Sequence, residues 1–247
     1  MHKKVDVIGA PINLFDWEGV ITKISEWAEL RQSKVVCICN AHSLVTAKRS
    51  LSFARIIRRA DLATPDGMPV AWMLGFMTGN RPKRISGPDL MLRYCRHAAA
   101  SEQSIYLYGG SQATLDSLVV ALQRQFPGLI IAGFYSPPFR ELTTEEADAV
   151  VDAINSSGAN VVWVGLGCPK QELWMSENYG RVNAVMIGVG AAFDYHAGTL
   201  RRAPVWMQNC GLEWLYRLAN EPRRLWKRYL VTNTLFIWYS ARQLLSI

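Results

Sequence analysis

A glycine-containing turn in residues 160–172 has the residue types and spacing that suit a phosphate group. The apolar run at 161–164 is typical of a strand, and two glycines after it form a turn without side-chain obstruction. Pro169 suits the first turn of a following helix. Such a turn presents backbone N–H groups to an anion, and a lysine beside it adds a positive charge. We therefore predict a diphosphate site. Its candidate residues are Gly165, Gly167, Lys170 and Gln171.

Other polar residues and glycines follow predicted strands elsewhere in the chain. Asp66 lies between Pro65 and Gly67, where it is either an ordinary turn aspartate or a general base. Asn40 opens a helix, so a capping role is its simplest interpretation. Arg84 is either a solvated charge or a phosphate contact. The remaining candidates are Gly109 and Gly110, a second turn that allows close backbone approach, and Asp194, a hydrogen-bond partner for a ribose or sugar hydroxyl.

The sequence lacks the common signatures of nucleotide and metal sites. Neither G-x-G-x-x-G nor G-x-x-x-x-G-K-[ST] is present, and no Asp-x-Asp pair is available to hold a metal on a diphosphate. His42, His97 and His196 are spaced too irregularly to suggest metal ligands. We therefore predict no metal and no cofactor. The charge of a bound diphosphate would be offset by Lys170, Arg84, helix N-termini or the arginines of the C-terminal tail.

The elements that must position these residues alternate between strand and helix. We expect strands at 5–8, 34–38, 62–64, 104–108, 129–134, 161–164 and 184–189, with helical stretches between them. This order predicts an α/β fold, a Rossmann-like and mostly parallel sheet with helices on both faces. Ligands bind such sheets at the carboxyl ends of the strands, where the candidate residues lie.

Charge divides the 247-residue chain into two parts. Residues 201–247 hold eight basic and two acidic residues, so this segment carries +6 of the total net charge of +7. We expect a catalytic domain at 1–198 and a basic, aromatic, helical appendage at 199–247. The basic residues point to a polyanionic partner.

The appendage favours an anionic membrane surface over nucleic acid. Its aromatic residues follow the basic cluster as one apolar block instead of interleaving with it as stacking platforms do. The uncharged stretch at 229–241 is too short to span a bilayer but suits a helix that lies in the interface. The alternative is a helix that packs on the core or on another subunit. The five cysteines comprise one C-x-C pair, with no second pair at metal-site spacing, and three scattered residues. With no secretory signal, they suggest reduced, buried thiols in a cytosolic protein.

Motifs distributed in order over nearly the whole chain resemble the WecG/TagA/CpsF family of bacterial glycosyltransferases. Each motif alone is weak, and the ordered set is specific. They are Asn40-Ala41, Thr64-Pro-Asp-Gly67, Arg84-Ile-Ser-Gly-Pro-Asp-Leu90, Tyr108-Gly-Gly110, Pro127-Gly-Leu129, Gly165-Leu-Gly-Cys-Pro-Lys-Gln-Glu172, Gly188-Val-Gly-Ala-Ala-Phe-Asp194, Arg202-Ala-Pro204, Gly211-Leu-Glu-Trp-Leu-Tyr-Arg-Leu218 and Glu221-Pro-Arg-Arg224.

This resemblance implies a chemistry and a place for it. Family members transfer a sugar from a nucleotide diphosphate to a polyprenyl-diphosphate-linked sugar at the cytoplasmic face of the bacterial inner membrane, with inversion and without a metal. By resemblance Asp66 is the base that deprotonates the acceptor hydroxyl, and Asn40 and Gln171 contact the sugars. The tail would close over the site and meet the lipid diphosphate through Arg217, Arg224, Lys227 and Arg228.

The sequence departs from the family pattern at two positions, and two alternative functions are kept beside the glycosyltransferase. Ile38 and Ala192 stand where some members have a threonine and a glycine, so the donor and acceptor sugars are not carried over. The alternative functions are a Rossmann-type nicotinamide-dependent oxidoreductase, which the missing glycine fingerprint disfavours, and a non-catalytic membrane adaptor. The sequence leaves a homo-oligomer open, because the tail could pack on its own core or on a neighbour's.

Overall fold

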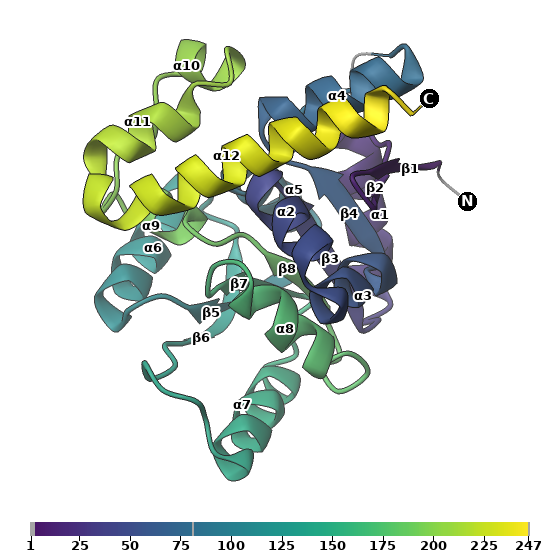
Figure 1. Cartoon of the computed structure of the whole chain (residues 1–247). Coiled ribbons are helices and arrows are strands. Elements are labelled where there is room, and N and C mark those ends of the chain that lie inside the picture. The colour runs from purple at the N-terminus through teal and green to yellow at the C-terminus, as the bar shows by residue number, and fades with distance from the viewer. Residues whose placement is uncertain (1–2, 81, 247) are drawn as a thin grey trace. The chain divides into compact units, whose positions relative to one another are not determined.

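A computed structural model describes residues 3–80 and 82–246 and confirms the α/β class. Six parallel strands form the main sheet in the order β4-β3-β8-β7-β5-β6 (Figure 1). Their bounds are β3 Lys34–Cys39, β4 Leu62–Pro65, β5 Ser104–Gly109, β6 Ile130–Tyr135, β7 Val161–Gly165 and β8 Val185–Gly188. Strands β7 and β8 are apolar and almost entirely buried, as expected of parallel strands covered on both faces.

The chain divides into two compact units. Unit 1 contains residues 1–16, 38–86 and 201–247, and unit 2 contains residues 17–37 and 87–200. The appendage predicted at 199–247 thus groups with two earlier segments of the chain. The assignment of catalysis to 1–198 and of membrane association to 199–247 stays a prediction.

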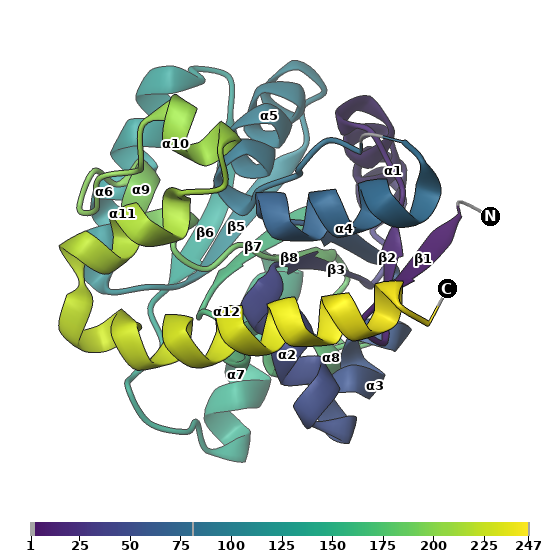
Figure 2. The ribbon, with the colours of Figure 1, turned by 45° about the horizontal axis from the view of Figure 1, so that its top comes forward.

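Helices lie on both sides of the strands in unit 2. Figure 2 shows α7 (Thr144–Ser156) and α8 (Lys170–Glu177) on one side, and α5 (Gly87–Ala100) and α6 (Gln112–Gln125) on the other. This division follows from right-handed crossovers, because the chain moves toward the β6 edge through α6 and returns through α7 and α8. Helix α1 (Trp17–Glu29) packs against α5, and the short α9 (Ala192–His196) packs against α5 and α6.

The first strand departs from a simple alternation. β1 (Lys4–Val7) pairs antiparallel with β2 (Ala10–Asn13) in a separate two-stranded sheet, and the sequence pattern had not indicated β2. Ile8 and Gly9 both have positive φ, of 48° and 98°, which makes the tight turn between the strands. Asn13 then accepts a hydrogen bond from the backbone of Ala63 at 2.9 Å and so ties this hairpin to β4.

The rest of unit 1 is helical. Helices α2 (Ala41–Arg49) and α3 (Leu51–Arg59) connect β3 to β4, and α4 (Met68–Thr78) follows β4. The described part of the tail is helical, as expected, and forms α10 (Val205–Asn209), α11 (Glu213–Asn220) and α12 (Pro222–Leu244). Figure 1 shows α12 running alongside α2, against which it packs.

The cysteines are free thiols, but the expectation that all are buried is wrong. Cys37, Cys39 and Cys95 are buried, Cys168 is half-buried and Cys210 is exposed. Cys210 is exposed because it ends the short α10, which buries only Gln208. Among the described residues, no helix combines the length and apolar composition needed to cross a bilayer.

Candidate functional site

Asp66 lies directly after β4, at the carboxyl end of the strand. Its backbone N–H donates to Cys39 O at 2.8 Å, and Ile85 N donates to Pro65 O at 2.8 Å, so hydrogen bonds hold the chain on both sides of the strand end. The side-chain Oδ1 accepts from Gly67 N at 2.7 Å. Gly67 has a φ of 76°, a conformation that few other residues adopt readily. The Thr-Pro-Asp-Gly sequence therefore fixes one orientation of the carboxyl group.

The surroundings of Asp66 raise its pKa to about 6 from an ordinary value of 3.8. Loss of solvent around the half-buried carboxyl is the main cause; the positive charge of Arg84 opposes it, and the negative charge of Glu213 adds to it. At neutral pH the group is still mostly ionised, but it holds a proton more tightly than an exposed aspartate. These are the properties of a general base that works near pH 7.

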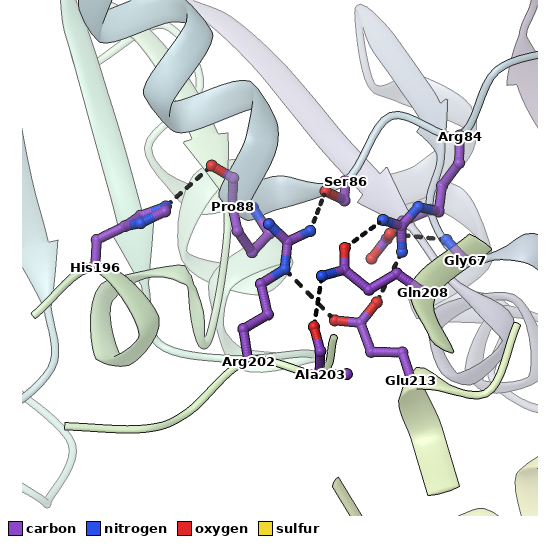
Figure 3. A network of polar contacts seen from close by, with 10 residues as sticks. Gly67, Arg84, Ser86, Pro88, His196, Arg202, Ala203, Gln208 and Glu213 are labelled. Carbon is purple, nitrogen blue, oxygen red and sulfur yellow. Dashed lines mark hydrogen bonds and ion pairs between the residues drawn. The ribbon is translucent and has the colours of Figure 1, made fainter. Parts of the chain in front are cut away.

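An ion-pair network surrounds this carboxyl within unit 1. Arg84 donates through Nη1 to Glu213 Oε2 at 2.7 Å and through Nη2 to Gln208 Oε1 at 2.9 Å. Arg202 donates to Ser86 Oγ at 3.2 Å, and its Nε lies 3.8 Å from Glu213 Oε1. Figure 3 shows Glu213 lying between the two arginines. We call these residues the Asp66 cluster: Asp66, Arg84, Arg202, Gln208 and Glu213.

Sequence reasoning missed three members of this cluster. It counted Arg202 and Glu213 in the charge of the tail and in two family motifs but gave neither a role at the site, and it did not consider Gln208. No local pattern could have found them, since 129 positions separate Arg84 from Glu213. The terminal nitrogens of Arg84, which we expected to be solvated or to face a phosphate, donate to side chains of α10 and α11.

Asn40 does cap a helix. Its side-chain oxygen accepts from His42 N at 3.0 Å and Ser43 N at 3.1 Å, and Ser43 Oγ accepts from Asn40 N at 2.8 Å, which completes a capping box at the start of α2. Asn40 immediately follows β3, and its β3 neighbour Cys39 accepts the hydrogen bond from Asp66 N. The contact of Asn40 with a sugar stays a prediction.

In unit 2 the predicted diphosphate turn is held together by Gln171. The buried Gln171 Oε1 accepts from Gly167 N at 3.2 Å and from Gly190 N at 3.0 Å, and Nε2 donates to Glu172 Oε1 at 3.0 Å. We expected free N–H groups at this turn, but that of Gly167 already has an acceptor within the protein, which it shares with Gly190 N from the loop after β8. Lys170 is exposed at the first position of α8.

The two glycine turns of unit 2 lie side by side. Gly109 pairs with Gly165 in the register of β5 and β7, and a Cβ on Gly109 would lie 2.7 Å from the Gly165 carbonyl carbon. A Cβ on Gly165 would lie 2.6 Å from Phe193 Cδ2. Gly110 O accepts from Ser136 Oγ at 2.7 Å. Gly109 is therefore required for close backbone packing at the carboxyl ends of β5 and β7, and Gly165 leaves room for the Phe193 ring.

Asp194 and His196 belong to α9, which follows β8. Asp194 O accepts from Leu200 N and from Thr199 Oγ1, both at 3.1 Å, and its carboxyl Oδ1 lies 3.4 Å from Thr199 Oγ1. His196 Nε2 donates to Pro88 O at 2.9 Å, so this side chain connects α9 to the start of α5. The described residues contain no cluster of three or more potential metal ligands.

Helix α12 has one face packed on the rest of unit 1 and one face exposed. Leu225, Thr232 and Phe236 are buried, Thr232 Oγ1 lies 3.4 Å from His42 Nδ1, and Gln243 Oε1 accepts from Ile8 N at 2.6 Å. The alternative of a helix packed on the core thus holds for this face. The opposite face exposes an apolar stripe of Trp226, Leu230, Val231, Ile237 and Trp238.

The four basic residues predicted to meet the lipid diphosphate all lie on α11 and α12. Arg217 is on α11 and is half-buried. Arg224 forms an ion pair with Glu221 at 2.9 Å. Lys227 Nζ lies 5.4 Å from the Trp226 ring centre, and the Arg228 guanidinium lies 5.6 Å from that of Tyr229. Basic groups thus lie among aromatic residues at the start of α12, so the expectation that the aromatic residues follow the basic cluster as one separate block is wrong for this turn of the helix.

The chain matches one protein-family model over nearly its whole length. Residues 5–247 match the model of the glycosyl transferase WecG/TagA/CpsF family. The match includes Asp66, the glycine turns of unit 2 and the three tail helices. The protein therefore belongs to the WecG/TagA/CpsF family of glycosyltransferases.

Proposed function

We propose that this protein is an inverting, metal-independent transferase that moves a hexose or N-acetylhexosamine-type sugar, ManNAc-like or glucose-like, in cell-surface polysaccharide biosynthesis. The donor is a nucleotide-diphosphate sugar, with UDP the first choice, and the acceptor is a polyprenyl-diphosphate-linked sugar. Family membership supports glycosyl transfer in polysaccharide biosynthesis. The single observation that carries the mechanism is the Asp66 carboxylate, fixed at the end of β4 with its pKa raised to about 6.

In the proposed reaction the acceptor hydroxyl oxygen attacks the anomeric carbon of the donor sugar. The bond from that carbon to the diphosphate oxygen breaks, and the nucleotide diphosphate leaves with the electron pair. Asp66 takes the hydroxyl proton. A single displacement of this kind inverts the anomeric configuration and needs one base and one stabilised leaving group.

The remaining residues would bind and orient the substrates. Lys170 and the turn with Gly165 and Gly167 would offset the charge that develops on the leaving diphosphate. Gly109 and Gly110 have no side chains and would let the diphosphate come close to the backbone. Gln171, Asn40 and Asp194 would contact sugar hydroxyls, and Arg84 is a candidate phosphate contact. Each of these roles is a prediction for a substitution experiment.

Helix α12 would lie on an anionic membrane surface at the cytoplasmic face of the bacterial inner membrane. Its exposed stripe includes Ile237, 67 % exposed, and Trp238, 53 % exposed, with Lys227 on the same helix. Basic charge plus exposed aromatic and aliphatic area is the combination that holds a helix in the lipid interface. Arg217, Arg224, Lys227 and Arg228 would then meet the acceptor diphosphate. Homo-oligomerisation stays open.

The test is sugar transfer to a short-chain prenyl-diphosphate sugar from a panel of UDP- and GDP-sugars, with and without EDTA. Free nucleotide diphosphate and elongated acceptor are measured together, and Asp66→Asn is assayed in parallel. We expect that EDTA does not reduce the rate of elongation by the wild type. The rate for Asp66→Asn should be lower by roughly 10²–10⁴-fold.

Three results would contradict the proposal. An unchanged rate in Asp66→Asn would exclude the base. Absence of elongation with every donor, together with tight binding to anionic vesicles, would favour a membrane adaptor. Binding of a nicotinamide cofactor by fluorescence titration would instead favour the oxidoreductase alternative.

A further inference from the structure

The Asp66 cluster contains two cations and two carboxylates that come from distant parts of the chain. Arg84 and Arg202 both lower the pKa of Asp66, whereas Glu213 raises it. With Glu213 present, the formal charges of the four ionised groups cancel. Without it, two guanidinium groups would face a single carboxylate, and Asp66 would bind a proton less tightly.

Glu213 is also the residue that fixes Arg84 in place. Its Oε2 accepts from Arg84 Nη1 at 2.7 Å while Oε1 faces Arg202, so one carboxylate engages both arginines. The side chains of Arg84 and Glu213 are only 12 % and 24 % exposed, which keeps the pair largely out of water and makes its charges effective. Gln208 holds the second terminal nitrogen of Arg84 and donates to Ala203 O at 2.7 Å.

The position of Glu213 depends on the tail helices. Glu213 is the first residue of α11, a helix that has no fully buried residue and packs against the other tail helices, α10 and α12. The preceding Gly211 packs so tightly on α4 that a Cβ there would lie 2.9 Å from Trp72 Cη2 and 3.1 Å from Met68 Cβ. Docking of the segment before α11 against α4 therefore sets where the Glu213 carboxylate lies.

We propose that Glu213 is a positioning residue: it holds Arg84 and Arg202 in a charge-balanced arrangement beside Asp66 and thereby makes Asp66 an effective base only when α11 is docked. This inference rests on the proposed role of Asp66. It adds that the tail contributes a carboxylate to the electrostatics of the base, besides the cations assigned to lipid binding. A tail displaced from unit 1 would leave Asp66 a weaker base.

The test compares wild type, Glu213→Gln, Glu213→Asp and the charge-matched control Glu26→Gln. Glu26 also forms a 2.7 Å ion pair, with Lys23, but on the exposed face of α1. The profile of kcat/KM against pH is measured for transfer to the short-chain prenyl-diphosphate sugar. We expect Glu213→Gln to move the acid limb to lower pH and to lower kcat at neutral pH by about tenfold, less than the roughly 10²–10⁴-fold that loss of a base costs. Glu213→Asp should recover part of kcat, and Glu26→Gln should match wild type.

A second measurement separates this inference from the proposed function. The ¹³C shift of the Asp66 carboxyl, assigned with Asp66→Asn, is titrated in each variant and reports the pKa of that group without any substrate. A lower Asp66 pKa in Glu213→Gln supports the inference even if no transfer is found for the wild type. An unchanged Asp66 pKa together with an unchanged acid limb would overturn it, whatever happens to overall stability or to kcat.

Discussion

Replacing Asp66 by Asn should make the protein more stable at neutral pH while it removes transfer activity. Folding raises the pKa of this carboxyl from 3.8 to about 6, so the folded state binds the Asp66 proton more tightly than the unfolded chain. A shift of about two pKa units corresponds to about 3 kcal/mol. An asparagine keeps the oxygen that accepts from Gly67 N and carries no charge to desolvate.

The sign of the effect follows from the direction of the shift. The stabilisation from the protonated carboxyl is fully present below about pH 4 and is lost as the pH rises toward about 6. Asp66→Asn should therefore exceed wild type by up to about 3 kcal/mol in unfolding free energy at pH 7.5, and by less than about 1 kcal/mol at pH 4. In a chain of this size the larger figure corresponds to a Tm increase of roughly 6–12 °C.

The assay is thermal unfolding followed by circular dichroism at both pH values. Asp6→Asn is the matched control, because Asp6 Oδ1 also accepts from a glycine N–H, that of Gly9 at 2.7 Å, but is exposed. It should change Tm little at either pH. A Tm of Asp66→Asn at or below wild type at pH 7.5, or the same increase at pH 4 as at pH 7.5, would refute the reasoning about desolvation.

Three further substitutions test the glycine turns and the tail. Gly165→Ala should cost about 1–3 kcal/mol of unfolding free energy, measured by urea denaturation, because its Cβ would lie 2.6 Å from Phe193 Cδ2. Gln171→Ala leaves two backbone N–H groups without their acceptor, so it should cost roughly 2–4 kcal/mol and weaken nucleotide-diphosphate binding measured by calorimetry. Lys227→Glu should weaken sedimentation with anionic vesicles by about 30-fold, at about 1 kcal/mol for each unit of charge near the surface.

Each of these predictions has a control and a contrary outcome. Gly198→Ala meets no atom within 4 Å, but its φ of 76° strains any side chain there, so this variant reports backbone strain without a steric clash. A Gly165→Ala variant as stable as wild type would contradict the packing argument. Gln112→Ala is the control for Gln171→Ala. It removes an exposed amide whose hydrogen bond goes to Asp116, one turn along the same helix, and it should leave nucleotide binding intact. Lys227→Glu should bind uncharged vesicles as wild type does, and an equal loss there would rule out an electrostatic contribution.

Local pattern was enough to predict most of the fold. Val161–Val164, Ser104–Tyr108 and Val185–Gly188 are short, mostly apolar runs that end at or near a glycine, and runs of this length bounded by turn residues are typical of buried parallel strands. The hairpin of β1 and β2 was harder, because Ala10–Asn13 contains a proline and has no clear alternation. Its formation depends on the positive φ angles of Ile8 and Gly9, which a sequence pattern does not report for an isoleucine.

The sequence by itself determined the class of the chain, the position of Asp66 at a strand end and the basic character of the tail, because these depend on neighbouring residues and on composition. Only the tertiary structure decided which charges face Asp66. Arg84, Arg202 and Glu213 meet because β4, α11 and the loop that precedes α5 fold into one unit. Local spacing in the sequence cannot predict a pairing between residues so far apart. The tertiary structure likewise decided that Gln171 binds the turn that we expected to be open to a ligand. The side-chain oxygen of Gln171 accepts a hydrogen bond from Gly190 N, which lies in a later loop.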